Sequence, residues 1–436
     1  MSTPRLSPQC SLLTRFRRSN QGAVAPLIAI VMLALIGCMG FAIDVGRSVL
    51  VRARLVDALD AAGLAVGARL STTDYSADAL KFVSANFKGG YAGATVTKVT
   101  ATANSTKSVI SLSATATVPT IFMKLFGQKS VTVNAASEVT RSSTGLELVM
   151  VLDNTGSMDD SHSMPTLRKS ANDLVDILFG GDAVATNLYV GLVPFSQTVN
   201  IGTSRTSWMT GTKPFGWSGC VLARKAPLDQ TDDPPSATSY KFGYYKYDPF
   251  SLTYYYNRYC PQSVTPLTNV KSTISNAINA MTADGNTHIN LGAVWGWRMI
   301  SPRWRGYWGS ATLPLDYGTK NMSKAMVLMT DGKNTMFDSI YTAYGNLSDN
   351  NLGYRLTESQ AEAELNKRLT TVCNSVKSSG IIIYTVAFAI TDPTAKSLLQ
   401  NCATNSSYYF DAANQTALNT AFQTIGDSLS NLRVSK

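Results

Sequence analysis

The sequence contains little histidine and no concentrated positive charge. Only two histidines occur among the 436 residues, and neither lies in an HExxH motif or in a Ser/His/Asp arrangement. The formal net charge is +10, but no run of Lys or Arg is longer than a pair, so the basic residues do not indicate nucleic-acid binding. A glycine-rich phosphate loop with lysine is also absent. These absences argue against zinc peptidases, nucleic-acid binders and nucleotide hydrolases.

One long segment carries no charge at all. Residues 22–43 contain Pro26 as their only helix breaker, in the first turns where proline is tolerated. At 1.5 Å per residue a helix of this length spans roughly 33 Å, about one bilayer core. Four arginines and no acidic residue occur in residues 1–21. We therefore expect a transmembrane helix at 22–43, with residues 1–21 as a basic cytoplasmic tail.

Three kinds of N-terminal processing compete with an intact anchor. A secretory signal would need a small-x-small site before a polar start, and none is found. Leu35-Ile36-Gly37-Cys38 loosely resembles a lipoprotein processing box, but the chain stays apolar beyond Cys38. Cleavage after Gly22, as in type IV pilin-like precursors, lacks the usual acidic residue, because Leu27 stands there. Anchoring is the interpretation that these residues favour.

The six cysteines fall into two groups. Cys10 and Cys38 would lie in the cytoplasm and in the membrane. The other four are Cys220, Cys260, Cys373 and Cys402. An even number of cysteines outside the cytoplasm indicates disulfides, and the spacing does not match a zinc site. We predict the pairs Cys220–Cys260 and Cys373–Cys402, because the members of each pair lie within one segment.

Residues 44–144 read as a helix followed by an antiparallel sheet. Apolar residues at a helical period continue from the membrane segment to about Leu70. Three Thr- and Val-rich segments follow at 94–101, 108–118 and 130–140, and the second alternates cleanly. Thr120 to Phe126 could form a short helix closed by Gly127. This order gives a small α+β region that is pilin-like in outline.

From residue 145 the pattern changes to α/β. Segments 146–152, 188–195, 325–330 and 381–389 are apolar on both faces, as in a parallel sheet covered by helices. Helical stretches are expected near 166–179, 268–282, 290–300, 356–379 and 414–431. The predicted fold is therefore a Rossmann-like, mostly parallel sheet with helices on both faces.

One stretch of this α/β region, residues 203–266, is too long for a plain loop. It contains Cys220 and Cys260 and is rich in tyrosine. Its tyrosines include Tyr244, Tyr245, Tyr247, Tyr254, Tyr255, Tyr256 and Tyr259. We interpret it as a disulfide-closed insertion. Two roles remain open, an adaptable binding surface and a self-packed cap over the sheet.

Candidate metal-binding residues follow the apolar strands. Asp153, Thr155 and Ser157 come directly after the run Leu148 to Leu152. Asp331 ends a second apolar strand, and Thr287 stands just before an expected helix. The carboxyl ends of such strands are where open α/β sheets bind ligands. Carboxylate and hydroxyl oxygens suit Mg²⁺, or Mn²⁺ or Ca²⁺, better than zinc. Taken alone, the first motif could equally be a turn with hydroxyl caps.

These three pieces together resemble the metal-ion-dependent adhesion site of von Willebrand factor A domains. That family coordinates a divalent cation through DxSxS, a distal Thr and a distal Asp. The resemblance implies that the ligands here are Asp153, Thr155, Ser157, Thr287 and Asp331. Thr155 departs from the usual Ser but keeps the hydroxyl. In the related domains an acidic residue of a protein ligand completes the coordination.

Other segments resemble the TadG-like Flp pilus-assembly proteins. They are Asn20–Pro26, Ala42–Arg47, Asp57–Val66, Trp217–Val221, Asn286–Gly292, Trp295–Arg298 and Ser301–Pro302. The resemblance implies a single-pass protein of the bacterial inner membrane working in the Tad machinery. It implies a TadE/TadG-like region at 44–144 and a von Willebrand factor A domain at 145–435 in the periplasm, with the outer membrane or cell surface as alternatives. The bulky Trp295–Arg298 segment is expected to pack structurally at the sheet edge.

Three functions follow, in order of preference. The first is non-enzymatic binding of an acidic residue on a pilus or Tad-machinery partner, with no small-molecule substrate. The second is a pilus scaffold whose metal only stabilises the fold. The third is metal-dependent hydrolysis, which needs a base near the cation. His288 adjoins Thr287 and His162 follows the first motif, so these two are the candidate bases.

Overall fold

The computed structural model describes residues 24–67, 74–104, 109–140, 145–245 and 259–434. The chain divides into two compact units: an N-terminal unit of residues 1–66 and 74–140, and a C-terminal unit of residues 141–436 together with 67–73. The predicted basic tail and the candidate cleavage site after Gly22 lie outside the described residues.

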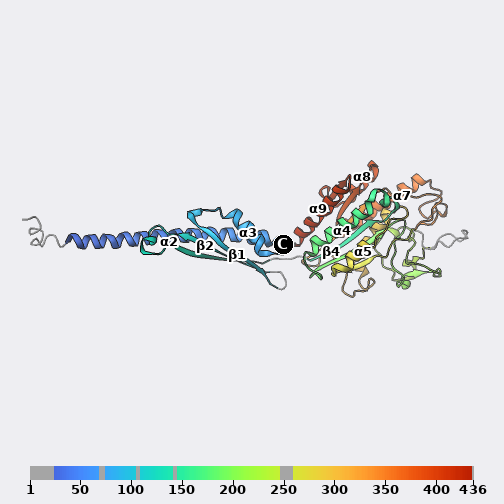
Figure 1. The fold of residues 1–436 in the computed structure, drawn as a ribbon. Helices are drawn as coiled ribbons and strands as arrows, with labels where there is room; N and C mark the ends of the chain where they lie inside the picture. The colour runs from blue at the N-terminus through green and yellow to red at the C-terminus, as the bar shows by residue number, and fades with distance from the viewer. Residues whose placement is uncertain (1–23, 68–73, 105–108, 141–144, 246–258, 435–436) are drawn as a thin grey trace, which may run out of the picture. The chain divides into compact units, whose positions relative to one another are not determined.

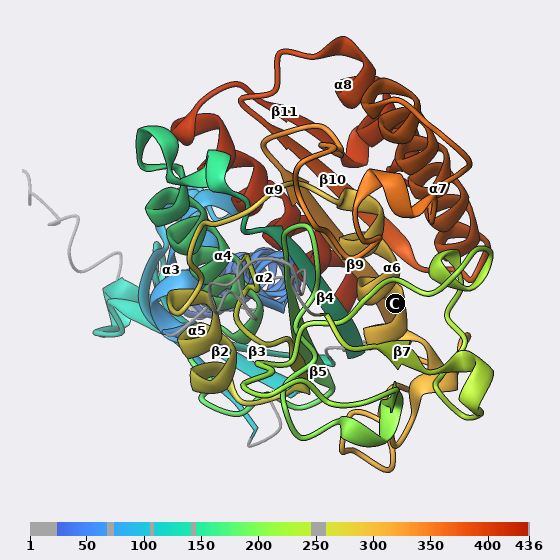
Figure 2. The same ribbon diagram turned by 90° about the vertical axis from the view of Figure 1, so that its right-hand side faces the viewer.

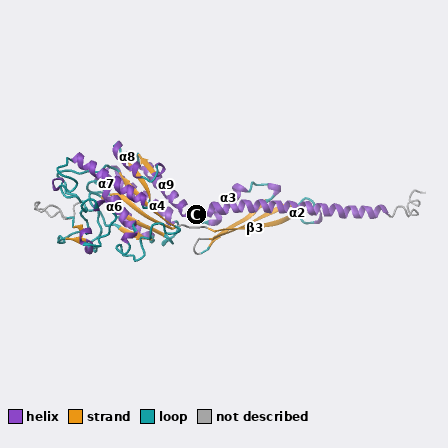
Figure 3. Cartoon of the chain, turned by 180° about the vertical axis from the view of Figure 1, so that it is seen from behind, coloured by secondary structure: helices purple, strands orange, loops and turns teal. Residues whose placement is uncertain are grey.

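The N-terminal unit is built on one long helix, α2 (Val24–Gly67), with a sheet beside it (Figures 1 and 3). Strands β1 (Thr95–Ala103), β2 (Val109–Pro119) and β3 (Ser130–Thr140) form an antiparallel sheet in the order β1-β2-β3. A second helix, α3 (Tyr75–Asn86), precedes the sheet and is one that the sequence did not predict. Asp74 caps it by accepting a hydrogen bond from the backbone N–H of Ala77.

Helix α2 packs into a hydrophobic core through its second half. There Val51, Leu55 and Leu59 pack against the inward residues of β2, such as Ile110 and Leu112. The side chains of β2 alternate between this core and the exterior because successive residues of a strand point to opposite faces. Nearly all of the apolar first half is exposed, and among the described residues α2 alone is long and apolar enough to cross a membrane.

The C-terminal unit contains a six-stranded sheet between two layers of helices (Figure 2). Its strands, across the sheet, are β11 (Tyr409–Ala412), β10 (Ile382–Phe388), β9 (Met322–Thr330), β4 (Gly145–Asp153), β5 (Leu188–Phe195) and β8 (Thr265–Thr268). Every pair is parallel except β5 with β8. Taken in chain order the arrangement is 3-2-1-4-5-6, which is the doubly wound order. The predicted mostly parallel, Rossmann-like sheet is confirmed.

Helices cover both faces of this sheet, as expected. One layer consists of α4 (Ser163–Phe179), α5 (Lys271–Asn279) and α9 (Gln415–Val434). The other consists of α6 (Ile289–Ile300), α7 (Glu358–Ser378) and α8 (Pro393–Cys402). Strand β4 is buried along its whole length because it lies between the two layers. The sequence did not predict α8, β8 or β11.

Helix α6 lies over the middle of the sheet, so the expectation that Trp295–Arg298 packs at its edge is wrong. Two glycines on α6 allow the close approach. A Cβ on Gly292 would lie 2.6 Å from Cδ1 of Phe195 in β5, and one on Gly296 would lie 2.4 Å from Cγ2 of Val151 in β4. Trp295 belongs to the same buried cluster and packs on Phe242 of the insertion, with ring centroids 4.8 Å apart.

The insertion at 203–266 contacts α6 through Phe242, Leu228 and Thr231. It contains only the short strands β6 (Met209–Thr210) and β7 (Phe242–Gly243). Five of its large side chains are buried, namely Trp208, Trp217, Phe242, Tyr244 and Tyr245, whereas Phe215 is exposed. Tyr247 and Tyr254 to Tyr256 lie outside the described residues. In its described part the insertion is therefore a self-packed cap.

Both predicted disulfides are formed. Cys220 bonds to Cys260 and closes the insertion. Cys373 of α7 bonds to Cys402 at the end of α8, so the second bridge ties two neighbouring helices together. Cys38 is a free thiol, exposed on α2.

Short 3₁₀ helices connect the larger elements. They are Tyr91–Gly93, Met123–Phe126, Gly156–His162, Thr206–Trp208, Leu228–Gln230, Thr238–Tyr240, Pro302–Trp304, Leu347–Asp349 and Ser406–Tyr408. The one at Met123–Phe126 is the short helix predicted before Gly127, which ends it in a left-handed conformation.

Candidate metal centre

Asp153 is the last residue of β4, and its carboxylate is fully buried. One carboxylate oxygen accepts a hydrogen bond from the backbone N–H of Thr155 at 2.8 Å, and the other accepts one from the Thr330 hydroxyl at 2.5 Å. Burial raises the pKa of Asp153, while the hydrogen bonds from Thr155 and Thr330 act in the opposite direction. Asp153 forms no ion pair with any residue that the structure describes.

The hydroxyls of the first motif connect Asp153 to Asp331. Thr155 Oγ1 and Ser157 Oγ are 3.0 Å apart, and Ser157 Oγ donates to Asp331 Oδ1 at 2.7 Å. Asp331 directly follows β9, which pairs with β4 in parallel, so the two strands end at the same edge of the sheet. Oxygens from two strand ends therefore meet at one point.

Thr287 reaches this edge on a third segment. The loop before it is held against the first motif, because the N–H of Gly156 donates to the Gly285 carbonyl at 2.9 Å. The N–H of Asp284 donates in turn to the Asn154 carbonyl at 2.8 Å. A Cβ built on Gly332 would lie 3.6 Å from Thr287 Oγ1, so the Thr287 hydroxyl lies beside the residue after Asp331.

The chemistry of these donors fits a hard divalent cation. Two carboxylates and three hydroxyls offer oxygens only, which is what Mg²⁺, Mn²⁺ and Ca²⁺ prefer. No group of three or more His, Cys, Asp or Glu side chains is gathered for a metal within the described part of the chain, so hydroxyl oxygens would have to contribute. A buried carboxylate without a cationic partner is unfavourable, and a bound cation would remove that cost.

Two residues that the sequence did not single out support the site. Thr330, in β9, donates its hydroxyl to Asp153 and could have been suspected because it directly precedes Asp331. Gln197 is fully buried, and its Oε1 accepts the N–H of Asn286 at 2.9 Å. Its Nε2 donates to the carbonyl of Tyr341 at 2.6 Å. Gln197 thus supports the loop that carries Thr287, and no local sequence pattern marks it.

Neither histidine that was considered as a catalytic base is shown by the structure to act as one. His288 is fully buried, with Nδ1 3.0 Å from the Thr287 carbonyl and its ring centroid 5.7 Å from that of Tyr344. Burial lowers the pKa of His288 to about 4, so the ring is neutral at pH 7. A buried ring beside a tyrosine is a packing arrangement. The side chain of His162 lies outside the described residues.

A buried ionic cluster joins the insertion to α7. The Arg368 guanidinium contacts Asp229 at 2.6 Å and Glu364 at 2.9 Å, and the Tyr344 hydroxyl donates to Asp229 at 2.9 Å. Arg298 of α6 donates to two insertion carbonyls, those of Thr231 and Leu228. Because each of these cations has a partner, the cluster is structural and holds the insertion in place.

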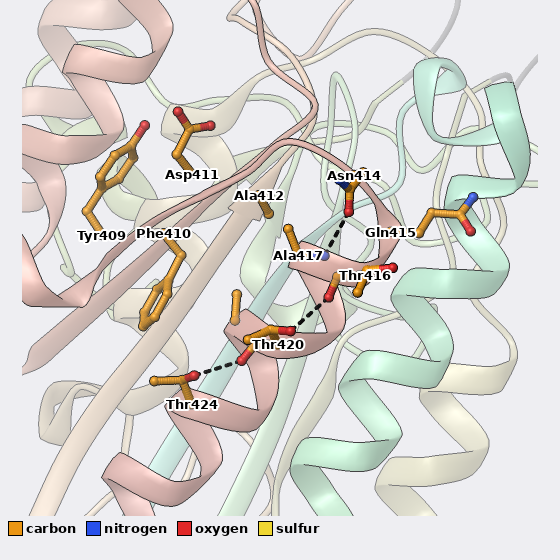
Figure 4. A pocket seen from close by; sticks show the side chains of 11 residues that line it. Tyr409, Phe410, Asp411, Ala412, Asn414, Gln415, Thr416, Ala417, Thr420 and Thr424 are labelled. Atoms are coloured by element: carbon orange, nitrogen blue, oxygen red, sulfur yellow. Dashed lines mark hydrogen bonds between the residues drawn. The ribbon is translucent and has the colours of Figure 1, made fainter.

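A separate hollow of about 860 Å³ lies between β11 and α9 (Figure 4). Two of the threonines on its helical wall donate their hydroxyls within the helix. Thr420 Oγ1 donates to the Thr416 carbonyl, and Thr424 Oγ1 donates to the Thr420 carbonyl. No predicted metal ligand lines this hollow, so we do not assign it to the metal centre.

Residues 22–69 match one family model. The family is described as putative Flp pilus-assembly TadE/G-like, and the matched residues include the whole of α2. A comparison with curated protein sequences finds no match. The family match supports a pilus-related role.

Several solved structures are similar to this chain at low identity. The von Willebrand factor domain of the type V pili tip protein Mfa5 from Porphyromonas gingivalis has 14% identity and a TM-score of 0.40, covering 67% of this chain and 97% of that one. The pilus adhesin SpaC from Lactobacillus rhamnosus GG has 12% identity and a TM-score of 0.39, covering 77% and 34%. Proximal thread matrix protein 1 from the mussel byssus, with a zinc-occupied MIDAS motif, has 15% identity and a TM-score of 0.34, covering 65% and 48%. With every TM-score below 0.5, none of these likenesses decides the function.

Proposed function

We propose that this protein is a membrane-anchored component of Tad/Flp pilus assembly that binds a protein partner through a divalent cation. The cation is Mg²⁺, or Mn²⁺ or Ca²⁺, held by Asp153, Thr155, Ser157, Thr287 and Asp331. Residues 22–43 span the bacterial inner membrane, 44–144 form a TadE/TadG-like region, and 145–435 form a periplasmic domain of the von Willebrand factor A type. The partner contributes an acidic residue, and the domain is not an enzyme.

The observation that carries this proposal is the meeting of the Asp153 and Asp331 segments through hydroxyl oxygens. Ser157 Oγ lies 2.7 Å from Asp331 Oδ1 and 3.0 Å from Thr155 Oγ1, so three candidate ligands are within one hydrogen-bonded group. Asp153 is held immediately beneath by Thr155 and Thr330. Such an arrangement brings two negatively charged carboxylates and several oxygen lone pairs to one point, and these groups favour the binding of a divalent cation.

The same residues leave an open side. Ser157 is exposed, whereas Asp153, Thr155 and Thr287 are buried. Mg²⁺ requires six oxygens and retains waters where the protein supplies fewer. A carboxylate of the partner would replace such a water and add a further favourable charge interaction with the cation. The fold then acts as a rigid holder, and specificity lies in the partner's acidic residue.

The anchor is supported by a different observation. The exposed side chains of the first half of α2 are almost all apolar, which is costly in water and favourable in a bilayer. The family match at 22–69 covers this same segment. With four arginines before the segment, the C-terminal unit is assigned to the periplasm.

A pull-down from envelope extract tests the proposal. Full-length protein in detergent is immobilised with Mg²⁺ or with a chelator, beside Asp153→Ala and the control Asp338→Ala, which removes an exposed acid from the loop after Asp331. We expect a partner retained only with the cation, by wild type and Asp338→Ala. A partner list that ignores both the cation and Asp153 would reduce the site to a structural role. Hydrolysis that is lost in His288→Ala would instead support an enzyme.

A further inference from the structure

The loop Thr120–Lys129, between β2 and β3, exposes large apolar side chains. Ile121 is 53% exposed, and Leu125 and Phe126 are each 77% exposed. We call this segment the apolar loop. Three exposed side chains of this size within six residues are unfavourable in water, and they indicate a surface that another apolar medium covers.

The apolar loop lies against the part of α2 that is proposed to cross the membrane. A Cβ on Gly40 would lie 2.6 Å from Cβ of Phe122, and one on Gly37 would lie 3.6 Å from Cζ of Phe126. Both glycines fall within residues 22–43. The small helix surface at these positions therefore lets the loop rest directly on α2.

Asp44 fixes the loop in this position. Its buried carboxylate accepts the backbone N–H groups of Ile121, Phe122 and Met123, each at 2.8 Å. From Asp44 the loop extends toward the N-terminus of α2, as far as Gly37. Seven residues of helix correspond to about 10 Å, so Phe126 lies about that far toward the membrane side of Asp44.

The charges of the loop fit a lipid surface. Lys124 and Lys129 are exposed, and residues 120–130 contain no acidic side chain. Lysine side chains at this level reach lipid phosphates while their stems remain in apolar surroundings. Apolar side chains about 10 Å below the polar boundary, with lysines among them, match the depth of interfacial membrane segments.

We propose that the apolar loop inserts into the bilayer leaflet next to Asp44, as a second membrane contact beside α2. Its partner is the lipid itself, in the headgroup and upper acyl region. Two contacts held together by Asp44 would fix the rotation and tilt of α2, which a single helix leaves free. This inference rests on the proposed membrane anchor, and the experiment below separates the two.

Fluorescent labels in liposomes test the insertion. Full-length protein with Cys10→Ser and Cys38→Ser carries one new cysteine, labelled with an environment-sensitive dye, in phosphatidylcholine–phosphatidylglycerol vesicles. The positions are Leu125→Cys in the loop, Leu33→Cys in the span and Phe215→Cys as an exposed control in the other unit. Quenching is measured with lipid-borne doxyl groups and with aqueous iodide. We expect doxyl lipids to remove roughly half of the signal at 33 and 125, and little at 215.

Each other outcome overturns the proposal in a distinguishable way. If 33 is quenched by doxyl lipid but 125 behaves like 215, the anchor stands and the inserted loop is wrong. If 33 also escapes the lipid quencher, the anchor fails and the inserted loop fails with it. If 125 is shielded from both quenchers, the loop is covered by protein, such as a second copy of the chain.

Discussion

Two buried aspartates, one in each unit, are accommodated in different ways. Asp44 is 2% exposed and accepts three backbone N–H groups, with the Arg47 guanidinium 3.7 Å away. Asp153 is 0% exposed and accepts hydrogen bonds from backbone N–H groups and threonine hydroxyls, including those of Thr155 and Thr330, with no ion pair to a described residue. A buried carboxylate needs donors and positive charge to offset its lost hydration. Asp44 has both, and Asp153 lacks the charge.

This difference separates a structural carboxylate from a candidate ligand. Protein groups supply the donors and the positive charge that the Asp44 carboxylate needs, and this carboxylate holds a loop. Asp153 shares its surroundings with a second carboxylate, Asp331, through Ser157 and Thr155. A cation would complete the second arrangement but has no place in the first. Burial alone therefore does not mark a binding site, whereas burial with incomplete compensation does.

The largest expected effect comes from a third buried carboxylate. Glu147 of β4 forms an ion pair with Lys324 of β9, and both side chains are buried. Burial lowers the pKa of Lys324, and the charge of Glu147 opposes that shift. We expect Lys324→Met to reduce the free energy of unfolding by about 3–5 kcal/mol, because Glu147 then stays buried without a cation.

Tryptophan fluorescence during urea denaturation measures this loss. All six tryptophans lie in the C-terminal unit, so the signal reports on that unit. The matched double variant Glu147→Gln/Lys324→Met should recover most of the stability, since no unpaired charge remains. A loss below about 1 kcal/mol in the single variant would contradict the view that a buried carboxylate here needs a cation.

His288 extends the comparison from buried carboxylates to a buried group that becomes positively charged when it binds a proton. Its folded pKa is about 4, below its ordinary value of 6.5, because of burial. Between these values the unfolded chain binds a proton that the folded chain does not. Stability from this residue is therefore complete above pH 6.5 and is lost as the pH falls toward 4, by about 2–3 kcal/mol. In chelator, His288→Gln should show a correspondingly flatter stability profile than wild type. Equal slopes would mean that His288 takes up its proton in the folded protein.

The increase in stability caused by Mg²⁺ can be measured in variants of Asp44 and of Asp153, which compares the two aspartates directly. At a hundred times its dissociation constant, Mg²⁺ should raise the stability of the C-terminal unit by about 2.7 kcal/mol. Asp44→Asn should keep this increase, and Asp153→Asn should abolish it. Thermal unfolding of the full-length protein with Mg²⁺ or chelator, followed by tryptophan fluorescence, gives the result. An increase that survives in Asp153→Asn would place the cation elsewhere.

The smallest expected effect concerns Thr155. Thr155→Ser keeps the hydroxyl, so Mg²⁺ affinity should stay within about threefold of wild type. Thr155→Val keeps the shape but removes the oxygen, and the affinity should fall by at least about tenfold. Isothermal titration calorimetry compares the two variants. If valine and serine behave alike, the Thr155 oxygen is not a ligand.

Much of the fold was predictable where the hydrophobic pattern of a segment in the sequence matches its burial in the structure. The strands β4, β5, β9 and β10 were found because fully covered strands are continuously apolar. Strand β8 was missed because it has only four residues, all half-buried, and includes Pro266. Strand β11 is a four-residue strand at the sheet edge, and α8 has only 10 residues. Short elements give too few positions for a period to be recognised.

For the candidate site, the sequence indicated the residues but not their support. The first motif and the TDG strand end were visible as short patterns. Thr330 and Gln197 were not identified, because a buried hydroxyl or amide looks the same in sequence as an exposed one. Gln197 acts on Asn286 and Tyr341, which are 89 and 144 positions away.

The sequence by itself determined the uncharged membrane-length segment, the parallel-sheet strands, the disulfide pairs and the candidate ligands. Each of these depends on composition, period or spacing within one segment. Tertiary structure alone decided that the Asp153 and Asp331 segments meet, that α6 covers the centre of the sheet, and that the apolar loop rests on α2. Ser157 and Asp331 are 174 positions apart, and Asp44 bonds to residues 77 to 79 positions away. A hydrogen bond requires a donor and an acceptor within about 3 Å of each other. For residues so far apart in the sequence, only the packing of the assembled sheets and helices brings the two groups to that distance.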